Sequence, residues 1–439
     1  MRARRPLAVL LAMGLCVAAC SDGDDATGEA EEVASPTTTP AAVAEEPAED
    51  GGGGAGTESS AAAPAPTGAM FDIDAVLAAD PNCPDPVTGE ALVIGYAADM
   101  GDLGAFGDGP ASQSAIHMAN LINCSGGLAG RPVEVRMSPI NGDPVASRDA
   151  TLALIDDGAS VLLGPPFPDP GFRVLQVADG EVPVIFTGST EPALGDDSNL
   201  SFLVAYSDTQ GATAAAQFSR SQGWSTAVTF SSPGPYFGYN PLVFTEEFTA
   251  QGGRVIADFP MIPGETEDFS GPIEVFAANP PDVIFSGMLA NQLVALKAQL
   301  AEAGLTEVEV LGTDAFEATG GYSLAPGTEG IYHVTHTDPR PDTRLERLLT
   351  SFTAANGGVG PAAPSMAALA GDAMAVIADA YLRVGTTDPR VLGEAIAVAE
   401  GVEGITGVLT YDRSGAPNKP MYIHKVVDGE PTIAGIIGG

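Results

Sequence analysis

Lysine is almost absent from this chain of 439 residues, in which only Lys297, Lys419 and Lys425 occur. Lysine and arginine together number 18, aspartate and glutamate number 57, and the formal net charge at pH 7 is −39. A protein that binds nucleic acid needs clustered cations opposite the phosphates. No such cluster occurs, so we expect no nucleic-acid partner, and the acidic excess indicates solubility outside the cell.

The sequence also lacks the patterns that are typical of enzymes. It contains no G-x-S-x-G nucleophile elbow and no Walker phosphate loop. Gly101, Gly104 and Gly107 do not have the spacing of a dinucleotide fingerprint, and the aspartates around them would repel phosphate. We therefore predict a protein without catalytic activity and without a cofactor.

The four histidines, His117, His333, His336 and His424, lack the spacing of metal ligands. His333 and His336 would share a face on a helix, but the surrounding sequence IYHVTH is typical of a strand. On a strand the two side chains would point to opposite faces. We predict structural or surface histidines and no metal site.

The N-terminus has the order of a bacterial lipoprotein signal. Basic residues at positions 2, 4 and 5 precede an apolar run over 7–19 that is too short to span a membrane, and the sequence VAAC follows at 17–20. We predict a signal peptide over 1–19, lipidation of Cys20 and an extracytoplasmic protein anchored to the outer face of the cell membrane. The alternative is an ordinary secretory signal in which Cys20 is incidental.

Residues 20–86 are rich in alanine, glycine, proline, threonine and glutamate, and they predict a disordered acidic linker. Because Cys16 would leave with the signal peptide, Cys83 and Cys124 remain as a pair in an oxidising compartment. They indicate a disulfide, with two buried free thiols as the alternative.

Short apolar runs alternate with helical patterns through the rest of the chain. One series of predicted strands covers 91–95, 133–137, 160–164 and 182–186, and a second covers 226–231, 254–259, 282–286 and 308–312. This alternation is typical of parallel sheets covered on both faces, so we predict an α/β fold with two doubly wound lobes. No run after the signal peptide approaches membrane-spanning length. The glycine-rich loop at 101–109 follows the first strand, where such sheets bind ligands.

Six short motifs follow one another in the order found in one protein family. They are GGLAGR at 126–131, NGDP at 141–144, FTGSTEP at 186–192, DTQG at 208–211, YFG at 236–238 and the segment 404–415. Together they resemble the type I periplasmic solute-binding proteins, in particular the branched-chain amino-acid (leucine/isoleucine/valine) binding proteins of ABC transporters. The resemblance covers about residues 90–430.

The resemblance implies two lobes joined by a three-strand hinge, with a ligand cleft between them. Crossings are expected near 206–210, 333–338 and 404–409. The N-terminal lobe would then comprise 87–207 and 336–407, and the C-terminal lobe 208–335 and 408–439. The family implies a monomer that closes on its ligand and is recognised by an ABC permease in the membrane. A ligand-sensing module of the same fold, acting on a membrane receptor, is the alternative.

The family's ligand residues carry over only in part. Ser189 and Thr190 stand in the loop that binds the ligand carboxylate, although capping of the next helix is an equal alternative. Asp314 stands at the acid that binds the ligand ammonium, or else caps a helix. Phe106 and Phe237 stand at aromatic positions of the cleft.

Other positions depart from the family pattern. Phe167 and Pro168 replace a hydroxyl-rich loop, and Pro168 has neither a hydroxyl nor an N–H. Ser207 replaces a second ammonium-binding acid, and Met288 replaces a cleft tyrosine. We therefore expect a more apolar pocket and a ligand that is an amino acid, an amide or a urea-like molecule.

Overall fold

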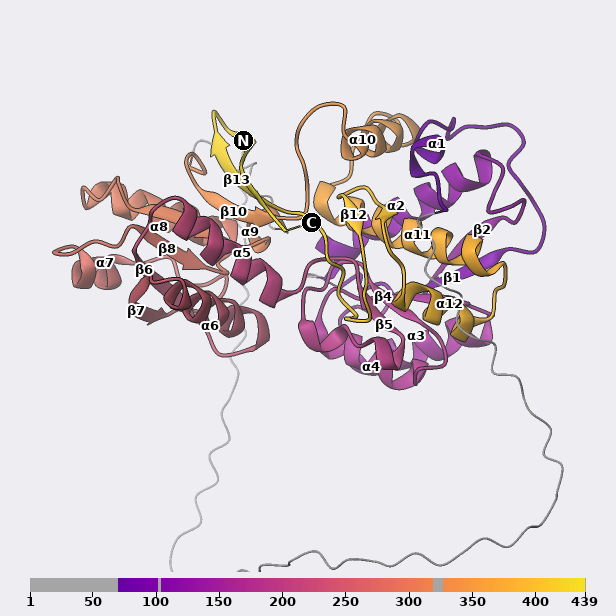
Figure 1. Cartoon of the computed structure of the whole chain (residues 1–439), viewed down its shortest axis with the longest axis horizontal. Coiled ribbons are helices and arrows are strands. Elements are labelled where there is room, and N and C mark those ends of the chain that lie inside the picture. Colours follow the sequence, from indigo (N-terminus) through magenta and orange to yellow (C-terminus); the bar gives the residue numbers. More distant parts are fainter. Residues whose placement is uncertain (1–69, 102–103, 319–326, 439) are drawn as a thin grey trace, which may run out of the picture. The chain divides into compact units, whose positions relative to one another are not determined.

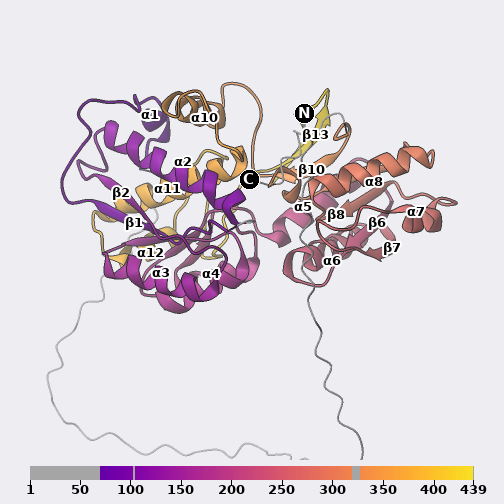
Figure 2. The ribbon, with the colours of Figure 1, turned by 180° about the vertical axis from the view of Figure 1, so that it is seen from behind.

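The computed structural model describes residues 70–101, 104–318 and 327–438. The predicted signal peptide, the lipidation site Cys20 and the linker as far as residue 69 lie outside the described residues. Within the described part the chain forms two α/β lobes, each built on its own sheet (Figure 1, Figure 2).

The sheet of the first lobe contains five parallel strands in the order β2-β1-β3-β4-β5. Its apolar side chains alternate between two cores, so that Ile94 and Leu163 lie in one core, while Leu162 and Val184 lie in the other. Both faces of the sheet are therefore covered, as the apolar runs predict. The strands are β1 (Leu92–Tyr96), β2 (Val133–Met137), β3 (Val161–Gly164), β4 (Val184–Phe186) and β5 (Ser201–Leu203).

Helices from both ends of the chain cover this sheet. Helices α2 (Gly104–Cys124) and α11 (Pro364–Val384) pack in the first core, together with part of α12 (Pro389–Ala397). Helices α3 (Pro144–Asp156) and α4 (Pro168–Ala178) pack in the core on the opposite face. Other elements of this lobe are α10 (Arg344–Ala355), the 3₁₀ turns Pro192–Leu194 and Asp197–Asn199, β11 (Val402–Glu403) and β12 (Val408–Leu409).

The second lobe repeats the strand order of the first and adds a hairpin. Five parallel strands lie in the order β7-β6-β8-β9-β10, and the antiparallel pair β13–β14 extends the sheet beyond β10. The strands are β6 (Thr226–Ser231), β7 (Arg254–Pro260), β8 (Val283–Ser286), β9 (Glu309–Gly312), β10 (Tyr332–Thr335), β13 (Met421–Val427) and β14 (Glu430–Ile437).

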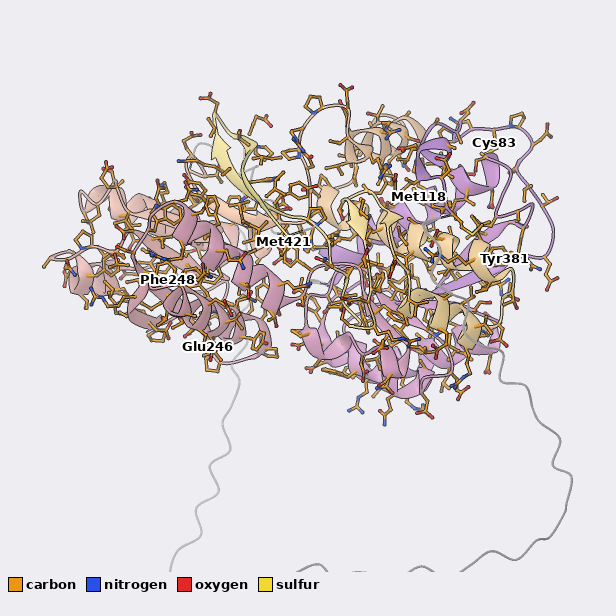
Figure 3. The ribbon with its side chains drawn as sticks, in the orientation of Figure 1. Cys83, Met118, Glu246, Phe248, Tyr381 and Met421 are labelled. Atoms are coloured by element: carbon orange, nitrogen blue, oxygen red, sulfur yellow. A yellow bond between two sulfur atoms is a disulfide. The ribbon has the colours of Figure 1, made fainter. Side chains whose placement is uncertain are left out.

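Helices α5 (Asp208–Ser221) and α6 (Pro235–Ala250) cover one face of this second sheet. Helices α7 (Ser270–Phe276) and α8 (Ala290–Glu302) cover the other face, and the short helix α9 (Ala315–Ala318) follows β9. Figure 3 labels Met118 in the first lobe and Phe248 in the second, and each side chain is buried in its own lobe's core.

Helix α11 corrects the expectation that no apolar run after the signal peptide approaches membrane-spanning length. Of the described helices, it alone has the length and apolar composition of a membrane span, and 94% of that window is buried inside the protein. Such burial is what the central helix of a packed domain shows.

The last part of the predicted linker belongs to the fold. Helix α1 (Ile73–Leu77) buries Ile73, Val76 and Leu77 in the first core, and the Phe71 N–H donates to the carboxylate of Asp379 on α11. The prediction of a disordered linker as far as residue 86 is therefore wrong from residue 70 onward, because the segment MFDIDAVL carries a buried apolar face.

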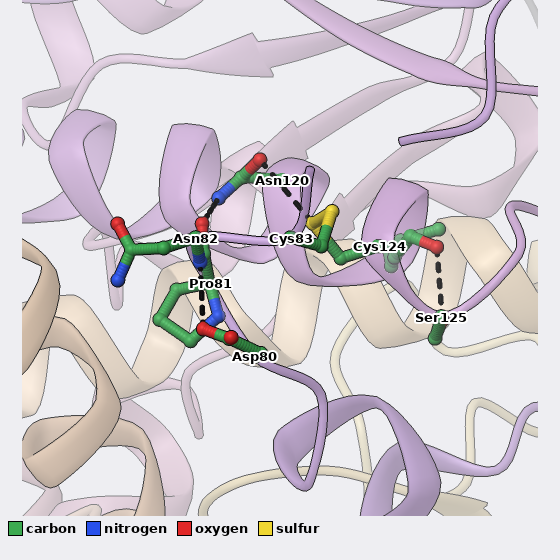
Figure 4. Close-up of a disulfide and its surroundings, with 8 residues drawn as sticks. Asp80, Pro81, Asn82, Cys83, Asn120, Cys124 and Ser125 are labelled. Atoms are coloured by element: carbon green, nitrogen blue, oxygen red, sulfur yellow. Dashed lines mark hydrogen bonds between the residues drawn. A yellow bond between two sulfur atoms is a disulfide. The ribbon is translucent and has the colours of Figure 1, made fainter. Parts of the chain in front are cut away.

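Cys83 and Cys124, the predicted pair, form a disulfide (Figure 4). Beside it, the Asn120 side-chain amide donates to the Pro81 carbonyl over 2.6 Å. Both links attach the segment before β1 to the end of α2.

Three passages of the chain connect the two lobes. Ala205 packs in the first lobe and Tyr206 in the second, and the chain returns between Val334 and Leu345. The third passage lies between Tyr411 and Met421, later than the predicted boundary at 407/408. That boundary is wrong because β12 pairs with β11 and because the Tyr411 hydroxyl donates to the Leu203 carbonyl over 2.7 Å.

Candidate functional site

The strand order places the ligand-binding edge of each lobe. In doubly wound sheets ligands bind at the carboxyl ends of the strands, where the order reverses. This point lies between β1 and β3 in the first lobe and between β6 and β8 in the second. Most of the residues with a predicted ligand role follow these strands or their neighbours.

At the edge of the first lobe, Asp108 is engaged by its own neighbours. The Tyr96 hydroxyl donates to Asp108 Oδ1 over 2.7 Å and the Asp99 N–H donates to Oδ2 over 2.6 Å. The Tyr96 hydroxyl also lies 2.8 Å from Thr187 Oγ1. Burial raises the pKa of Asp108 well above its ordinary value. This carboxyl therefore fixes the loop after β1 to the start of α2.

The glycine loop nevertheless contributes an apolar surface. Phe106 is half-buried against the first core, and Phe167 is 41% exposed at the N-cap of α4. A Cβ added at Gly188 would lie 3.2 Å from the sulfur of Met366 and 3.4 Å from Pro166. Gly188, in the loop after β4, thus faces apolar side chains.

Ser189, Thr190 and Ser207 lie close together at the first crossing. Ser207 caps α5: its Oγ accepts from the Gln210 N–H, while the Gln210 side chain accepts from the Ser207 N–H over 2.7 Å. The Thr190 carbonyl accepts from the Asp208 N–H over 2.7 Å. Ser189 Oγ lies 3.4 Å from the Glu191 N–H. Helix capping thus occupies Ser207, and only weak local contacts occupy Ser189.

Asp208 is a functional candidate that sequence reasoning missed. Burial raises the pKa of this carboxyl well above its ordinary value, and hydrogen bonds from Thr190 and Asn240 oppose the rise. The sequence does not show that this carboxyl is buried, because the DTQG motif indicates only a turn that starts a helix.

In the second lobe, Tyr236 and Asp314 form one unit. The Tyr236 hydroxyl donates to Asp314 Oδ1 over 2.5 Å, lies 2.6 Å from Thr313 Oγ1, and accepts from the Ala315 N–H over 3.2 Å. Asp314 is buried to 9% exposure. Phe237 packs edge-on against Tyr236, with ring centroids 5.2 Å apart. Met288 is fully buried in the core, and its contact with a ligand stays a prediction.

Tyr206 and His336, from the first and second crossings, extend this unit. Their rings stack with centroids 3.9 Å apart, and His336 Nε2 lies 3.3 Å from Asp314 Oδ2. Both side chains are buried, and neither Tyr206 Oη nor His336 Nδ1 has a hydrogen-bond partner among the described residues. We call Tyr206, Tyr236, Asp314 and His336 the hinge cluster. Its members other than Asp314 had no predicted ligand role.

A second set of polar side chains lies in the same lobe as Asp314. Glu317, His333 and His424 each offer a ligand atom, and these atoms all lie within 4.8 Å of one another. His333 and His424, which are far apart in the sequence, meet because β10 and β13 place them directly opposite each other.

Comparisons with known proteins agree with this architecture. A family model described as "Periplasmic binding protein" matches residues 91–431. A Leu/Ile/Val-binding protein homolog from Brucella suis is 22% identical over 77% of this chain and 87% of its own length. These matches place the described lobes within one family over nearly their whole length.

Three solved structures show the same fold, the type I periplasmic binding fold. A branched-chain amino-acid ABC transporter ligand-binding protein from Burkholderia xenovorans superposes with a TM-score of 0.70 at 18% identity, over 79% of this chain and 95% of that one. LivJ from Streptococcus pneumoniae with isoleucine gives 0.67 at 19%, over 80% and 100%. A solute-binding protein from R. palustris with benzoate gives 0.64 at 19%, over 79% and 96%. The chain belongs to the periplasmic binding protein family.

Proposed function

We propose that the chain is an extracytoplasmic solute-binding lipoprotein that delivers an amino acid or a related small amide to an ABC permease. The observation that carries this proposal is the hinge cluster: a buried carboxylate, Asp314, next to two buried polar atoms with no partner among the described residues. Buried polar groups are nearly always hydrogen-bonded, so such atoms mark a place for a ligand's own polar groups.

The chemistry of the cluster selects donors on the ligand. Asp314 accepts from Tyr236, and its remaining lone pairs suit an ammonium or an amide N–H. The aromatic rings of Tyr206, Tyr236 and Phe237 supply apolar area around that polar point. Phe167 and the contacts of Gly188 with Met366 and Pro166 make the opposite position poor in donors. A neutral amide fits this combination better than a free carboxylate.

The position of the cluster along the chain supplies the mechanism. Tyr206 and His336 lie at two of the three crossings, and Asp314 belongs to the second lobe. A ligand that also contacts the first lobe at Ser189 or Phe106 would favour a closed form over an open one. Closure then depends on how much more tightly the ligand binds the closed form.

The relatives support a small organic ligand. LivJ was solved with isoleucine and the R. palustris protein with benzoate, so the fold accepts both an amino acid and an aromatic acid. The lipobox at 17–20 supports attachment at Cys20, with the acidic segment as a tether to the membrane surface.

Ligand binding to the mature protein tests the proposal. We expect at least one amino acid, amide or urea to raise the melting temperature and to bind saturably by calorimetry. Asp314→Asn should weaken the binding of that ligand by about 10- to 150-fold, which corresponds to the loss of one hydrogen bond to a charged group. The matched control is Asp258→Asn, because Asp258 lies in the same lobe and its carboxylate accepts from the Thr229 and Ser231 hydroxyls.

Two results would contradict the proposal. One is the absence of saturable binding by the wild-type protein across amino acids, amides, ureas and aromatic carboxylates. The other is equal binding by the Asp314→Asn and Asp258→Asn variants. Anchoring is tested separately, by mass spectrometry of the cell-derived protein and by release of a Cys20→Ala variant from the membrane.

A further inference from the structure

The strongest unexplained feature outside the hinge cluster is the group Glu317, His333 and His424. His333 Nε2 lies 3.4 Å and His424 Nδ1 lies 3.8 Å from the same oxygen, Glu317 Oε1. The three ligand atoms are all within 4.8 Å of one another. We propose that these three side chains bind a divalent transition-metal ion, with Zn²⁺ as the best fit.

The spacing is that of a coordination shell. A tetrahedral Zn²⁺ with bonds of about 2.05 Å holds its ligand atoms about 3.3 Å apart. The two distances to Glu317 Oε1 are within about half an ångström of that value, so the glutamate and each histidine have the spacing of neighbouring ligands on one ion. Two histidines and one glutamate form a known three-ligand zinc set, in which a further donor takes the fourth position.

The orientation of His424 supports a cation in this place. Its Nε2 lies 2.9 Å from the Thr337 carbonyl, which can only accept, so Nε2 carries the hydrogen. In the neutral ring, Nδ1 then directs a lone pair at the Glu317 carboxylate. Two acceptors that face each other are stabilised by a cation between them. Metal-bound histidines almost always donate their other N–H to a carbonyl or carboxylate in this way.

A hydrogen bond also fixes the orientation of the Glu317 carboxylate. The Thr335 hydroxyl donates to Glu317 Oε2 over 2.6 Å, which leaves Oε1 directed at both histidines. Thr335 and His333 belong to one strand, β10, and His424 to its antiparallel partner β13. Both imidazoles are fully buried or nearly so, and the glutamate side chain is 8% exposed. The two histidines are thus held by paired strands of the sheet, and the Thr335 hydroxyl holds the glutamate of α9 beside them.

The choice of ion follows from ligand type and surroundings. Two imidazoles and a carboxylate suit Zn²⁺, Cu²⁺, Ni²⁺ or Fe²⁺, whereas Ca²⁺ and Mg²⁺ prefer oxygen ligands alone. The ion would join α9, β10 and β13, two of which adjoin passages between the lobes. Glu317 lies three residues after Asp314, so the ion would also fix the segment that carries the ligand-binding carboxylate.

Metal binding by the full mature chain, purified without a polyhistidine tag, tests this inference. After treatment with a chelator and dialysis, we expect one equivalent of Zn²⁺ per chain by metal analysis and competition with a coloured chelator. Co²⁺ should give the intense visible absorption of a four-coordinate site. His424→Gln and Glu317→Gln should weaken Zn²⁺ binding at least 100-fold, more than the about 10- to 100-fold typical of losing an outer-shell partner.

Two further variants separate the site from folding defects and from binding elsewhere. Thr335→Val keeps all three ligands and should weaken Zn²⁺ binding by about 10- to 100-fold. His117→Gln removes a histidine of the first lobe, which bonds to Ser351, and should leave Zn²⁺ affinity unchanged. The inference is overturned if the wild type shows no stoichiometric Zn²⁺ or Co²⁺ binding, or if Thr335→Val and His117→Gln bind the ion equally well.

Discussion

Replacing Lys419 by methionine should destabilise the protein by about 3–5 kcal/mol, the usual cost of removing one partner of a buried ion pair. Lys419 is 1% exposed, and its Nζ donates to Asp372 Oδ2 over 3.2 Å and to the Val204 carbonyl over 3.0 Å. Methionine has a similar length and no charge, so it fills the space without replacing either bond.

The remaining partner explains the size of the effect. Asp372 is fully buried on α11, and its carboxylate accepts from the Ile405 N–H over 2.6 Å, the Thr406 N–H over 3.1 Å and the Thr406 hydroxyl. Without Lys419 its charge has only neutral donors. Burial already lowers the pKa of Lys419, and Asp372 opposes that shift. The pair therefore depends on both of its members.

Urea unfolding measures the effect, with the fluorescence of Trp224, the sole tryptophan, for the second lobe and circular dichroism for the whole chain. Lys425→Met is the control. Lys425 lies over the Tyr332 ring at 4.5 Å and donates to its hydroxyl, and its loss should cost less than about 1 kcal/mol.

A double-mutant cycle isolates the pair from effects of shape. Asp372→Asn alone leaves a buried ammonium, whereas Asp372→Asn with Lys419→Met leaves no charge, so the double variant should lose less than the sum of the single variants. A Lys419→Met variant within 1 kcal/mol of the wild type, or a coupling energy near zero, would refute the reasoning.

Two further predictions concern pH and the disulfide. Because burial raises the pKa of Asp108, the folded state keeps this proton to higher pH than the unfolded state, so stability rises as the pH falls from neutral toward about 4. Asp108→Asn should flatten that part of a plot of melting temperature against pH, and an unchanged slope would contradict the assignment. The Cys83–Cys124 bond spans 41 residues, so replacing both cysteines by alanine should lower the unfolding free energy by about 4 kcal/mol. Equal urea midpoints for the two proteins would show that the bond contributes nothing.

Local signals in the sequence predict much of this fold. The runs at 160–164 and 282–286 became the buried strands β3 and β8, because a fully apolar strand has little alternative to a sheet's interior. Asp143 caps α3 through a bond to the Val145 N–H, as a polar residue before proline predicts. These features depend on neighbours within a few residues, which the sequence displays directly.

The sequence does not predict short strands or strands of mixed polarity, for a physical reason. Strand β5 has three residues, too few for a period to show. Strand β13 contains His424 and Lys425 among apolar residues, and its sequence alone does not show that the His424 side chain is buried. The boundary at 407/408 was placed from a motif, whereas the actual passage depends on the pairing of β11 with β12.

The two polar groups at the hinge show most clearly where sequence reasoning ends. His333 and His424 meet because β10 and β13 pair in one particular register, in which Tyr332 also lies opposite Lys425. A slip of one residue would turn His424 to the other face of the sheet and separate it from Glu317. His336, one residue beyond β10, instead reaches Asp314 and stacks on Tyr206. Two histidines three positions apart therefore serve two different groups, and although the alternation of a strand predicts that they separate, it does not show which residues each of them meets.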